Sequence, residues 1–278
     1  MTIRIVTDST CDLPAEIIQR YGIRVVPLYI NIAGKGYLDG IEITREEFYT
    51  RLPEYTPPAT TAVSAPEMYK QVYDELVTEG ATEILSLHIS TSLSAVLNSA
   101  QVAANETKSV RVTVCDSGQL GLGLGLMVEA VAQAAQRGAT MPEILAMLDD
   151  LGKRTHVFAA LDTLEFLKRS GRMNGTIAAM GTLLQVKPLL KMHEGKPTAE
   201  RVRTREGATR RLLELLEKVG KLERVALIHT NALVRVAELR ETAKHLLPAG
   251  DLLTVNITPV LGAHIGPGVI GFVCVAAK

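Results

Sequence analysis

The chain has 278 residues, and its 30 Lys and Arg balance 30 Asp and Glu, so the formal net charge is zero. This balance gives no basis for bulk binding to nucleic acid or to a membrane surface. Aromatic residues make up 4% and Trp is absent, which argues against a base-stacking platform. The hydrophobic fraction of 47% is typical of a globular protein, and the length suits one large or two modest domains.

Cysteine usage and the N-terminal segment indicate the cellular compartment of the protein. Cys11, Cys115 and Cys274 are far apart and form no Cys-x-x-Cys pair, which favours a reducing compartment over a disulfide scaffold. The chain opens directly into a strand-like segment, without a basic stretch followed by an apolar one, and no apolar run approaches the roughly 20 residues of a membrane span. We therefore expect a cytoplasmic protein with no signal peptide and no stable membrane insertion.

Strands and helices alternate through the first half of the sequence, which predicts a parallel sheet with helices on both faces. The predicted strands are 3–6, 23–32, 84–89 and 110–115, and the predicted helices are 14–22, 46–52, 66–79, 95–104, 126–137 and 140–154. Residues 53–66 carry four prolines and read as a long loop. Long ordered loops tend to be functional, although a plain connector is the alternative.

The stretch Glu83–Asn105 reads as strand, turn and helix, with hydroxyl side chains at positions 90, 91, 92 and 94. The free N–H groups at a helix start favour an anion, and hydroxyls can donate to a carboxylate or phosphate. Ordinary helix capping explains one such hydroxyl equally well. A glycine run at 121, 123 and 125 also follows a strand but lacks the dinucleotide-binding spacing, so we expect close helix–sheet packing there.

The second half predicts a mixed sheet, because hairpins interrupt the alternation. The predicted strands are 157–161, 186–192, 198–203, 225–230, 252–260 and 269–276, the helices are 162–169, 175–185, 205–219 and 232–245, and a tight loop covers 262–268. The fold class is therefore α/β with two domains. We predict an N-terminal three-layer α/β/α domain at 1–155 and a C-terminal mixed α/β domain at 156–278.

Local motifs point to few candidate catalytic or ligand-binding residues. There is no H-E-x-x-H, phosphate-binding loop or G-x-S-x-G, and the six histidines show no metal-ligand spacing. His264 lies among glycines where backbone can approach a ligand, and its ring could donate to an anion; a histidine bonded to backbone is the alternative. A hydrolase triad of Ser94, His264 and Asp8 is conceivable but has no support from spacing.

Arginines gather in the second half, at 172, 201, 203, 205, 210 and 211. Clustered guanidinium groups suit phosphate or an acidic partner, although a solvated charged face is the better interpretation from spacing alone.

Several short motifs, taken in order, resemble the DegV family of bacterial fatty-acid-binding proteins over nearly the whole chain. They are the segments 6–14, Asp39-Gly40, the Thr61 loop with 64–66, Ser92-Leu93-Ser94, Asp116-Ser117, 161–168 with Gly171-Arg172, 187–190 and 262–268. The sequence departs from the family pattern at Ala95-Val96, at Ala62-Val63-Ser64 and at Ser170.

The resemblance implies a long-chain fatty acid, such as palmitate or oleate, held in a tunnel between two α/β domains. Its carboxylate would be bound by Thr61, Ser94 and His264. The protein would be the non-catalytic lipid-binding partner of a fatty acid kinase subunit, with Arg172 contacting that partner or the phosphate. This implies a role in lipid transport or fatty acid metabolism, with no metal and no cofactor.

The residues are consistent with such a binding site, because a carboxylate among neutral donors needs no nucleophile or general base. At about 0.8 kcal/mol per buried methylene, a sixteen-carbon tail could contribute on the order of 10 kcal/mol before entropic costs. Met180 and Leu183, in the predicted small-residue helix, are candidate tunnel walls, with ordinary core as the alternative. The rival hypothesis is a small-molecule phosphotransferase or hydrolase that uses the same pocket.

Overall fold

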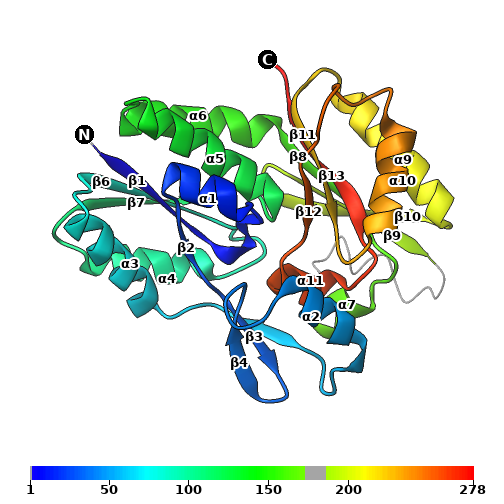
Figure 1. Cartoon of the computed structure of the whole chain (residues 1–278), viewed down its shortest axis with the longest axis horizontal. Helices are drawn as coiled ribbons and strands as arrows, with labels where there is room; N and C mark the ends of the chain where they lie inside the picture. The colour runs from blue at the N-terminus through cyan, green and yellow to red at the C-terminus, as the bar shows by residue number, and fades with distance from the viewer. Residues whose placement is uncertain (1, 173–185) are drawn as a thin grey trace.

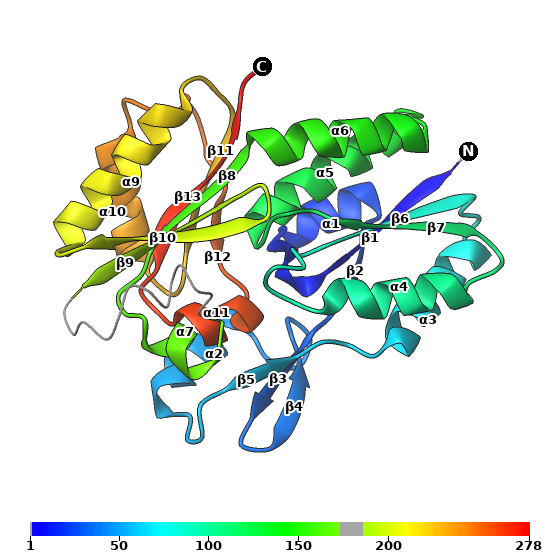
Figure 2. The ribbon, with the colours of Figure 1, turned by 180° about the vertical axis from the view of Figure 1, so that it is seen from behind.

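The computed structural model describes residues 2–172 and 186–278. Two α/β lobes, each built on its own sheet, stand side by side and touch along one broad face (Figures 1 and 2). The predicted fold class, α/β with one parallel and one mixed sheet, is confirmed. Within the described residues, the helices are all too short or too polar to cross a bilayer.

The N-terminal lobe is built on a sheet of four parallel strands in the order β2-β1-β6-β7. The strands are β1 (Ile3–Asp8), β2 (Arg24–Val26), β6 (Glu83–His88) and β7 (Arg111–Asp116). The covering helices are α1 (Ala15–Tyr21), α5 (Leu122–Gln136) and α6 (Met141–Arg154) on one face, and α3 (Pro66–Thr78) and α4 (Val96–Glu106) on the other (Figure 1). Because both faces are covered, β1 and β6 are buried along almost their whole length.

A small antiparallel sheet, β4-β3-β5, was not predicted. It contains β3 (Tyr29–Ile32), β4 (Lys35–Leu38) and β5 (Thr60–Ala62), and the nearby short helices are η1 (Ser9–Cys11), α2 (Arg45–Arg51) and η2 (Leu52–Glu54). The single strand predicted over 23–32 is therefore wrong. The segment breaks around Pro27, which cannot donate to a ladder, and its two halves enter different sheets. The predicted loop 53–66 also supplies β5, which pairs with β3.

The C-terminal lobe is built on a mixed sheet in the order β10-β9-β8-β13-β11-β12, in which only β11 and β12 pair in parallel. Its strands are β8 (Thr155–Ala160), β9 (Lys187–His193), β10 (Lys196–Val202), β11 (Leu222–His229), β12 (Thr254–Asn256) and β13 (Ile270–Ala276). Its helices are α7 (Glu165–Arg169), α9 (Arg205–Val219), α10 (Leu233–Ala243) and α11 (Pro259–Ile265). The proposed domain boundary, after residue 155, falls at the first residue of β8.

The strand period of two gives this sheet two apolar faces. Phe158 and Ala160 in β8 belong to a core under α9 and α10. Val157 and Ala159, one residue out of phase, belong to a larger core that continues into the N-terminal lobe. The inner face of the second sheet is therefore buried by the first lobe rather than by a helix layer of its own.

The glycine run lies in close helix–sheet packing, as the sequence predicts, and it also contributes to the contact between the lobes. A Cβ at Gly123 in α5 would lie 2.8 Å from Cγ2 of Val157 in β8, and a Cβ at Gly125 would collide with the carbonyl oxygen of Cys11. Both positions need a residue without a side chain, because α5 is pressed between the first sheet and the second lobe.

Two predictions near the C-terminus are wrong. The strand predicted over 252–260 is limited to Thr254–Asn256, and most of the loop predicted over 262–268 is helix α11. Pro259 suits the first turn of a helix, and Gly266, at φ 77°, ends it. The helix predicted over 175–185, with Met180 and Leu183, lies outside the described residues.

Candidate functional site

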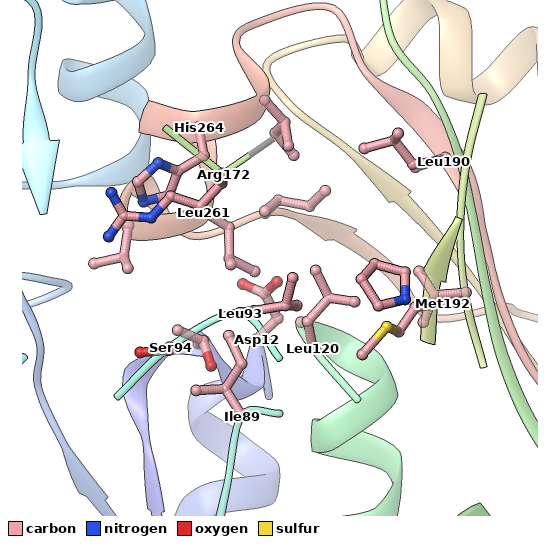
Figure 3. A pocket seen from close by; sticks show the side chains of 18 of the residues that line it. Asp12, Ile89, Leu93, Ser94, Leu120, Arg172, Leu190, Met192, Leu261 and His264 are labelled. Atoms are coloured by element: carbon pink, nitrogen blue, oxygen red, sulfur yellow. The ribbon is translucent and has the colours of Figure 1, made fainter. Parts of the chain in front are cut away.

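A cavity of about 150 Å³ lies between the two lobes (Figure 3). This is on the order of ten times the space that one water molecule needs, so the cavity suits a chain-like molecule better than a single ion. Most of its wall is apolar, and both lobes contribute, for example through Leu93 and Leu120 from the first and Leu190 and Met192 from the second.

The position of the cavity follows from the strand order of the first sheet. The chain leaves β1 towards β2 on one side, whereas β6 lies on the other side of β1, so the topology reverses between β1 and β6. Ligands of open parallel sheets bind beyond the carboxyl ends of the strands at such a point. The cavity is lined there by Thr10 and Asp12 after β1 and by Ile89, Leu93 and Ser94 after β6.

Thr61 and His264 meet at one end of the cavity although 203 positions separate them. Thr61 Oγ1 lies 2.9 Å from His264 Nε2. Thr61 comes from β5 of the unpredicted small sheet, and His264 from the last turn of α11, which packs against β5. The other ring nitrogen, Nδ1, is buried and finds no hydrogen-bond partner among the described residues.

The imidazole of His264 is neutral at physiological pH. Burial lowers its pKa to about 4, and the nearby positive charge of Arg172 adds to the effect. A neutral ring has one N–H and one lone pair, so the Thr61–His264 pair always has one hydrogen left for a further acceptor. If Nε2 donates to Thr61, the threonine hydroxyl is free to donate; if Nε2 accepts, Nδ1–H is free.

Ser94 is the one member of the predicted hydroxyl cluster that lines the cavity. Thr91 donates to Asp116, and Ser90 pairs with Ser92 at 2.9 Å. Among the described residues, the hydroxyl of Ser94 accepts one hydrogen bond, from the N–H of Val96 at the start of α4, and this bond is long at 3.4 Å. Three of the four hydroxyls therefore stabilise the turn, and the fourth is left to face the cavity.

Arg172, after the short helix α7, lies beside His264 at the same end of the cavity in Figure 3. The side chain is exposed, and its guanidinium donates to the carbonyl of Ser170 at 2.7 Å. Other arginines of the predicted cluster have acidic partners: Arg205 pairs with Asp162 and Arg211 with Glu200. Of the described arginines, Arg172 alone lines the cavity.

Sequence reasoning did not assign a role to Asp12, which lines the cavity in the turn after β1. Its Oδ1 accepts the backbone N–H of Thr258 at 2.7 Å and lies 3.4 Å from the guanidinium of Arg45. Arg45 also donates to the carbonyl of Asn256, and Thr258 donates through its hydroxyl to Asp39. These bonds tie residues 256–258 to the N-terminal part of the chain, so we call Asp12, Asp39, Arg45 and Thr258 the interlobe latch. A polar turn beyond the first strand of a parallel sheet was the available signal.

The hydrolase triad of Ser94, His264 and Asp8 is wrong. Asp8 is fully buried in the first lobe, where it accepts from His88 Nδ1 at 3.0 Å and from the N–H of Ile89 at 3.1 Å. The other ring nitrogen of His88 bonds Ser86 at 2.7 Å, and Ser86 in turn bonds Tyr73. This chain repeats the order of a Ser-His-Asp triad, but its members are completely buried, which excludes a substrate from the serine.

The site can hold an anion at one end and an apolar chain along the rest. Ser94, the Thr61–His264 pair and Arg172 are all donors, whereas the opposite end presents side chains such as Leu190 and Met192. The described residues contain no group of three or more His, Cys, Asp or Glu that could bind a metal ion. The structure brings the four predicted site residues to one end of one cavity; their roles stay predictions.

Known proteins resemble this chain over its full length. A family model described as an uncharacterised protein of the DegV family matches residues 2–277. A DegV domain-containing protein of Streptomyces coelicolor is 34% identical over 275 residues, which cover 98% of this chain and 97% of the relative.

Solved structures agree with this match. A DegV family protein from Thermus thermophilus, described by its fatty acid binding, is 37% identical with a TM-score of 0.91, and the match covers 100% of both chains. A stearic acid-binding protein from Eubacterium ventriosum is 26% identical with a TM-score of 0.89, over 99% of this chain and 98% of the other.

Proposed function

This chain belongs to the DegV family, and we propose that its interlobe cavity binds a long-chain fatty acid such as palmitate or oleate. One observation carries the proposal: a cavity at the switch point of the first sheet has donors gathered at one end and mostly apolar side chains along the remainder. The relatives that bind fatty acids share this fold at TM-scores of 0.91 and 0.89.

The carboxylate would lie among Ser94, Thr61 and His264. Ser94 supplies one hydroxyl hydrogen, and the Thr61–His264 pair supplies the hydrogen that its own bond leaves over. Hydrogen bonds to a charged acceptor contribute about 1.5–3 kcal/mol each. Because these donors are neutral at pH 7, the head group is bound without a permanently buried positive partner. Burial of the methylene chain then supplies most of the affinity.

The protein would act as a carrier rather than as an enzyme on its own. Arg172 is exposed at the head-group end, where a kinase subunit could reach the bound carboxylate, and its guanidinium suits phosphate recognition. We therefore propose that the protein presents the carboxylate to a fatty acid kinase subunit for acyl-phosphate formation. In the cell this is a cytoplasmic role in fatty acid metabolism or lipid transport.

Binding is tested by displacing a fluorescent fatty acid from delipidated protein with palmitate, oleate and their methyl esters. We expect both acids to displace the probe and the esters to bind at least about tenfold more weakly, because they lack the charged acceptor. Equal displacement by acid and ester would refute the head-group assignment. A failure of every acid to bind, or turnover of ATP or an ester by the protein alone, would refute the carrier function.

The kinase step is tested separately. The catalytic subunit of a fatty acid kinase is supplied with ATP, oleate and either the unchanged protein or Arg172→Ala. The expected result is oleoyl phosphate with the unchanged protein and a large loss with the variant, while oleate affinity changes little. A variant that supports the kinase fully would exclude Arg172 from this step, and no product with either protein would exclude the partnership with that kinase.

A further inference from the structure

Asp12 places a carboxylate oxygen in the part of the cavity that we propose holds the hydrocarbon chain of the ligand. The side chain is 1% exposed and lines the cavity, and its Oδ2 finds no hydrogen-bond partner among the described residues. A Cβ built on Gly121 would lie 3.3 Å from Oδ2 and 3.5 Å from Cδ1 of Leu261, and both of these residues also line the cavity. In Figure 3 the carboxyl group lies between Ser94 and His264 on one side and Leu190 and Met192 on the other.

The other oxygen of the same carboxyl is fully used. Oδ1 accepts from the N–H of Thr258 and faces Arg45, so the interlobe latch fixes the direction in which Oδ2 points. The backbone of Asp12 is in the left-handed region, at φ 57°, which Asp and Asn tolerate better than most residues. The carboxyl group is therefore fixed through Oδ1, which leaves Oδ2 unpartnered at the wall of the cavity.

A plain alkyl chain lying over this oxygen would offer it no hydrogen bond and would leave it buried without a partner. A buried polar atom without a partner is unfavourable, and more so when it is charged. A hydroxyl group at the matching point of the chain would donate to Oδ2 and remove this penalty. The same hydroxyl elsewhere in the tunnel would face apolar side chains and weaken binding.

We propose that Asp12 forms a polar subsite part-way along the cavity, which selects acyl chains carrying a hydroxyl group within the chain. This inference rests on the proposed function, because it names the class of fatty acid that the same cavity prefers. The subsite is distinct from the head-group donors, since Asp12 accepts a hydrogen bond whereas Ser94 and the Thr61–His264 pair donate.

The test is a displacement assay with stearate and a set of monohydroxylated stearates whose hydroxyl position moves along the chain. It is performed at about pH 8.5, because burial raises the pKa of Asp12 to about 7 and the carboxyl is then ionised. We expect one position, or two neighbouring positions, to bind about tenfold more tightly than the other isomers. The methyl ether of the preferred isomer, which cannot donate, should lose this advantage.

Asp12→Asn changes the chemistry of the subsite while keeping the shape of the side chain. The amide keeps an oxygen for the N–H of Thr258 and tolerates the left-handed backbone, but it can place an N–H₂ donor where Oδ2 was. The variant should therefore bind the hydroxyl isomer and its methyl ether about equally. Asp39→Asn is the matched control, because Asp39 belongs to the same latch and does not line the cavity; it should keep the preference of the unchanged protein.

The possible outcomes separate this inference from the proposed function. If stearate binds but no hydroxyl position is preferred, or if Asp12→Asn keeps the full preference for hydroxyl over ether, the polar subsite is refuted while fatty acid binding stands. If neither stearate nor any hydroxylated isomer binds, both proposals fall. The comparison of hydroxyl and ether in the unchanged protein decides the matter even if the variant does not fold.

Discussion

Two histidines in this protein stand in opposite situations. His88 is completely buried, and both of its ring nitrogens have partners in the chain that links Asp8 to Tyr73. His264 has one partner, Thr61, and its second nitrogen faces no acceptor among the described residues. The first arrangement leaves no ring nitrogen for a ligand, whereas the second leaves one ring nitrogen without a partner beside a cavity. We therefore base the proposed ligand site on His264 and not on the triad-like order of residues around His88.

The largest expected effect is a loss of stability when the buried hydrogen-bond network around His88 is broken. Asp8→Ala removes the acceptor for His88 and for the N–H of Ile89, in a region with no access to water. We expect a loss of about 3–5 kcal/mol in the free energy of unfolding, measured with urea, because at least two buried N–H donors would lose their acceptor. Ser86→Ala, in the same buried network, is the matched control. It leaves the Asp8–His88 pair intact, so its effect on stability should be smaller. A loss below about 1 kcal/mol for Asp8→Ala would contradict a structural role.

The interlobe latch should show itself in the pH dependence of stability. Burial raises the pKa of Asp12 to about 7 from 3.8, and the nearby carboxylate of Asp39 contributes, against the opposing effects of Arg45 and the N–H of Thr258. Between these two pH values the folded state binds more protons than the unfolded state, so stability falls as pH rises through this window. This contribution amounts to at most about 4 kcal/mol.

Asp12→Asn removes that titration. Urea unfolding from about pH 4 to about pH 8 should therefore show a smaller fall in the variant than in the unchanged protein, with the two curves parallel above about pH 7. Asp39, whose pKa burial also raises, still titrates in the variant, so some slope remains. Identical slopes in both proteins would contradict the buried, proton-binding state of Asp12.

A substitution of His264 should weaken ligand binding more than stability, which is the opposite of the effect expected in the network around His88. His264→Ala removes a donor at the head-group end, and we expect palmitate affinity to fall by about tenfold to a hundredfold while the free energy of unfolding changes by less than about 1 kcal/mol. Titration of a fluorescent fatty acid measures the first and urea unfolding the second. A variant that unfolds readily yet binds palmitate normally would reverse the comparison between the two histidines.

The smallest expected effect concerns the electrostatic repulsion between Arg172 and the protonated ring of His264. Arg172→Gln removes a positive charge, so the pKa of His264 should rise from about 4 by less than about one unit. Burial is the larger cause and persists, so the ring should stay neutral at pH 7. Proton NMR of the imidazole measures the shift. An unchanged pKa would show that the two side chains do not interact, and a lower one would contradict the repulsion between them.

Local sequence patterns predicted the strands and helices that surround the site better than the parts that form it. The parallel sheet follows from alternating apolar strands and helices, and the glycines of α5 were correctly read as packing positions. The strand that carries Thr61 was not predicted, because three residues are too few to show a period. The helix that carries His264 was not predicted, because the glycines at 262, 266 and 268 are typical of a loop.

The convergence of the site residues could not come from local pattern at all. Thr61 and His264 are 203 positions apart, and only the docking of α11 onto the small sheet brings them to 2.9 Å. The resemblance to the DegV family implied a role for both residues, whereas the spacing alone left open that His264 is a loop histidine bonded to backbone. Asp12 was overlooked because an aspartate in a turn is ordinary; its importance lies in the direction of one oxygen, which depends on Thr258 from the other lobe.

The most direct test of the central claim is a crystal structure of the protein with added stearate. The account predicts a continuous chain in the interlobe cavity, with its carboxylate within hydrogen-bond distance of Ser94 and of the Thr61–His264 pair and its tail running towards Leu190 and Met192. A chain bound in the reverse direction, or a cavity that stays free of stearate at saturating concentration, would contradict it.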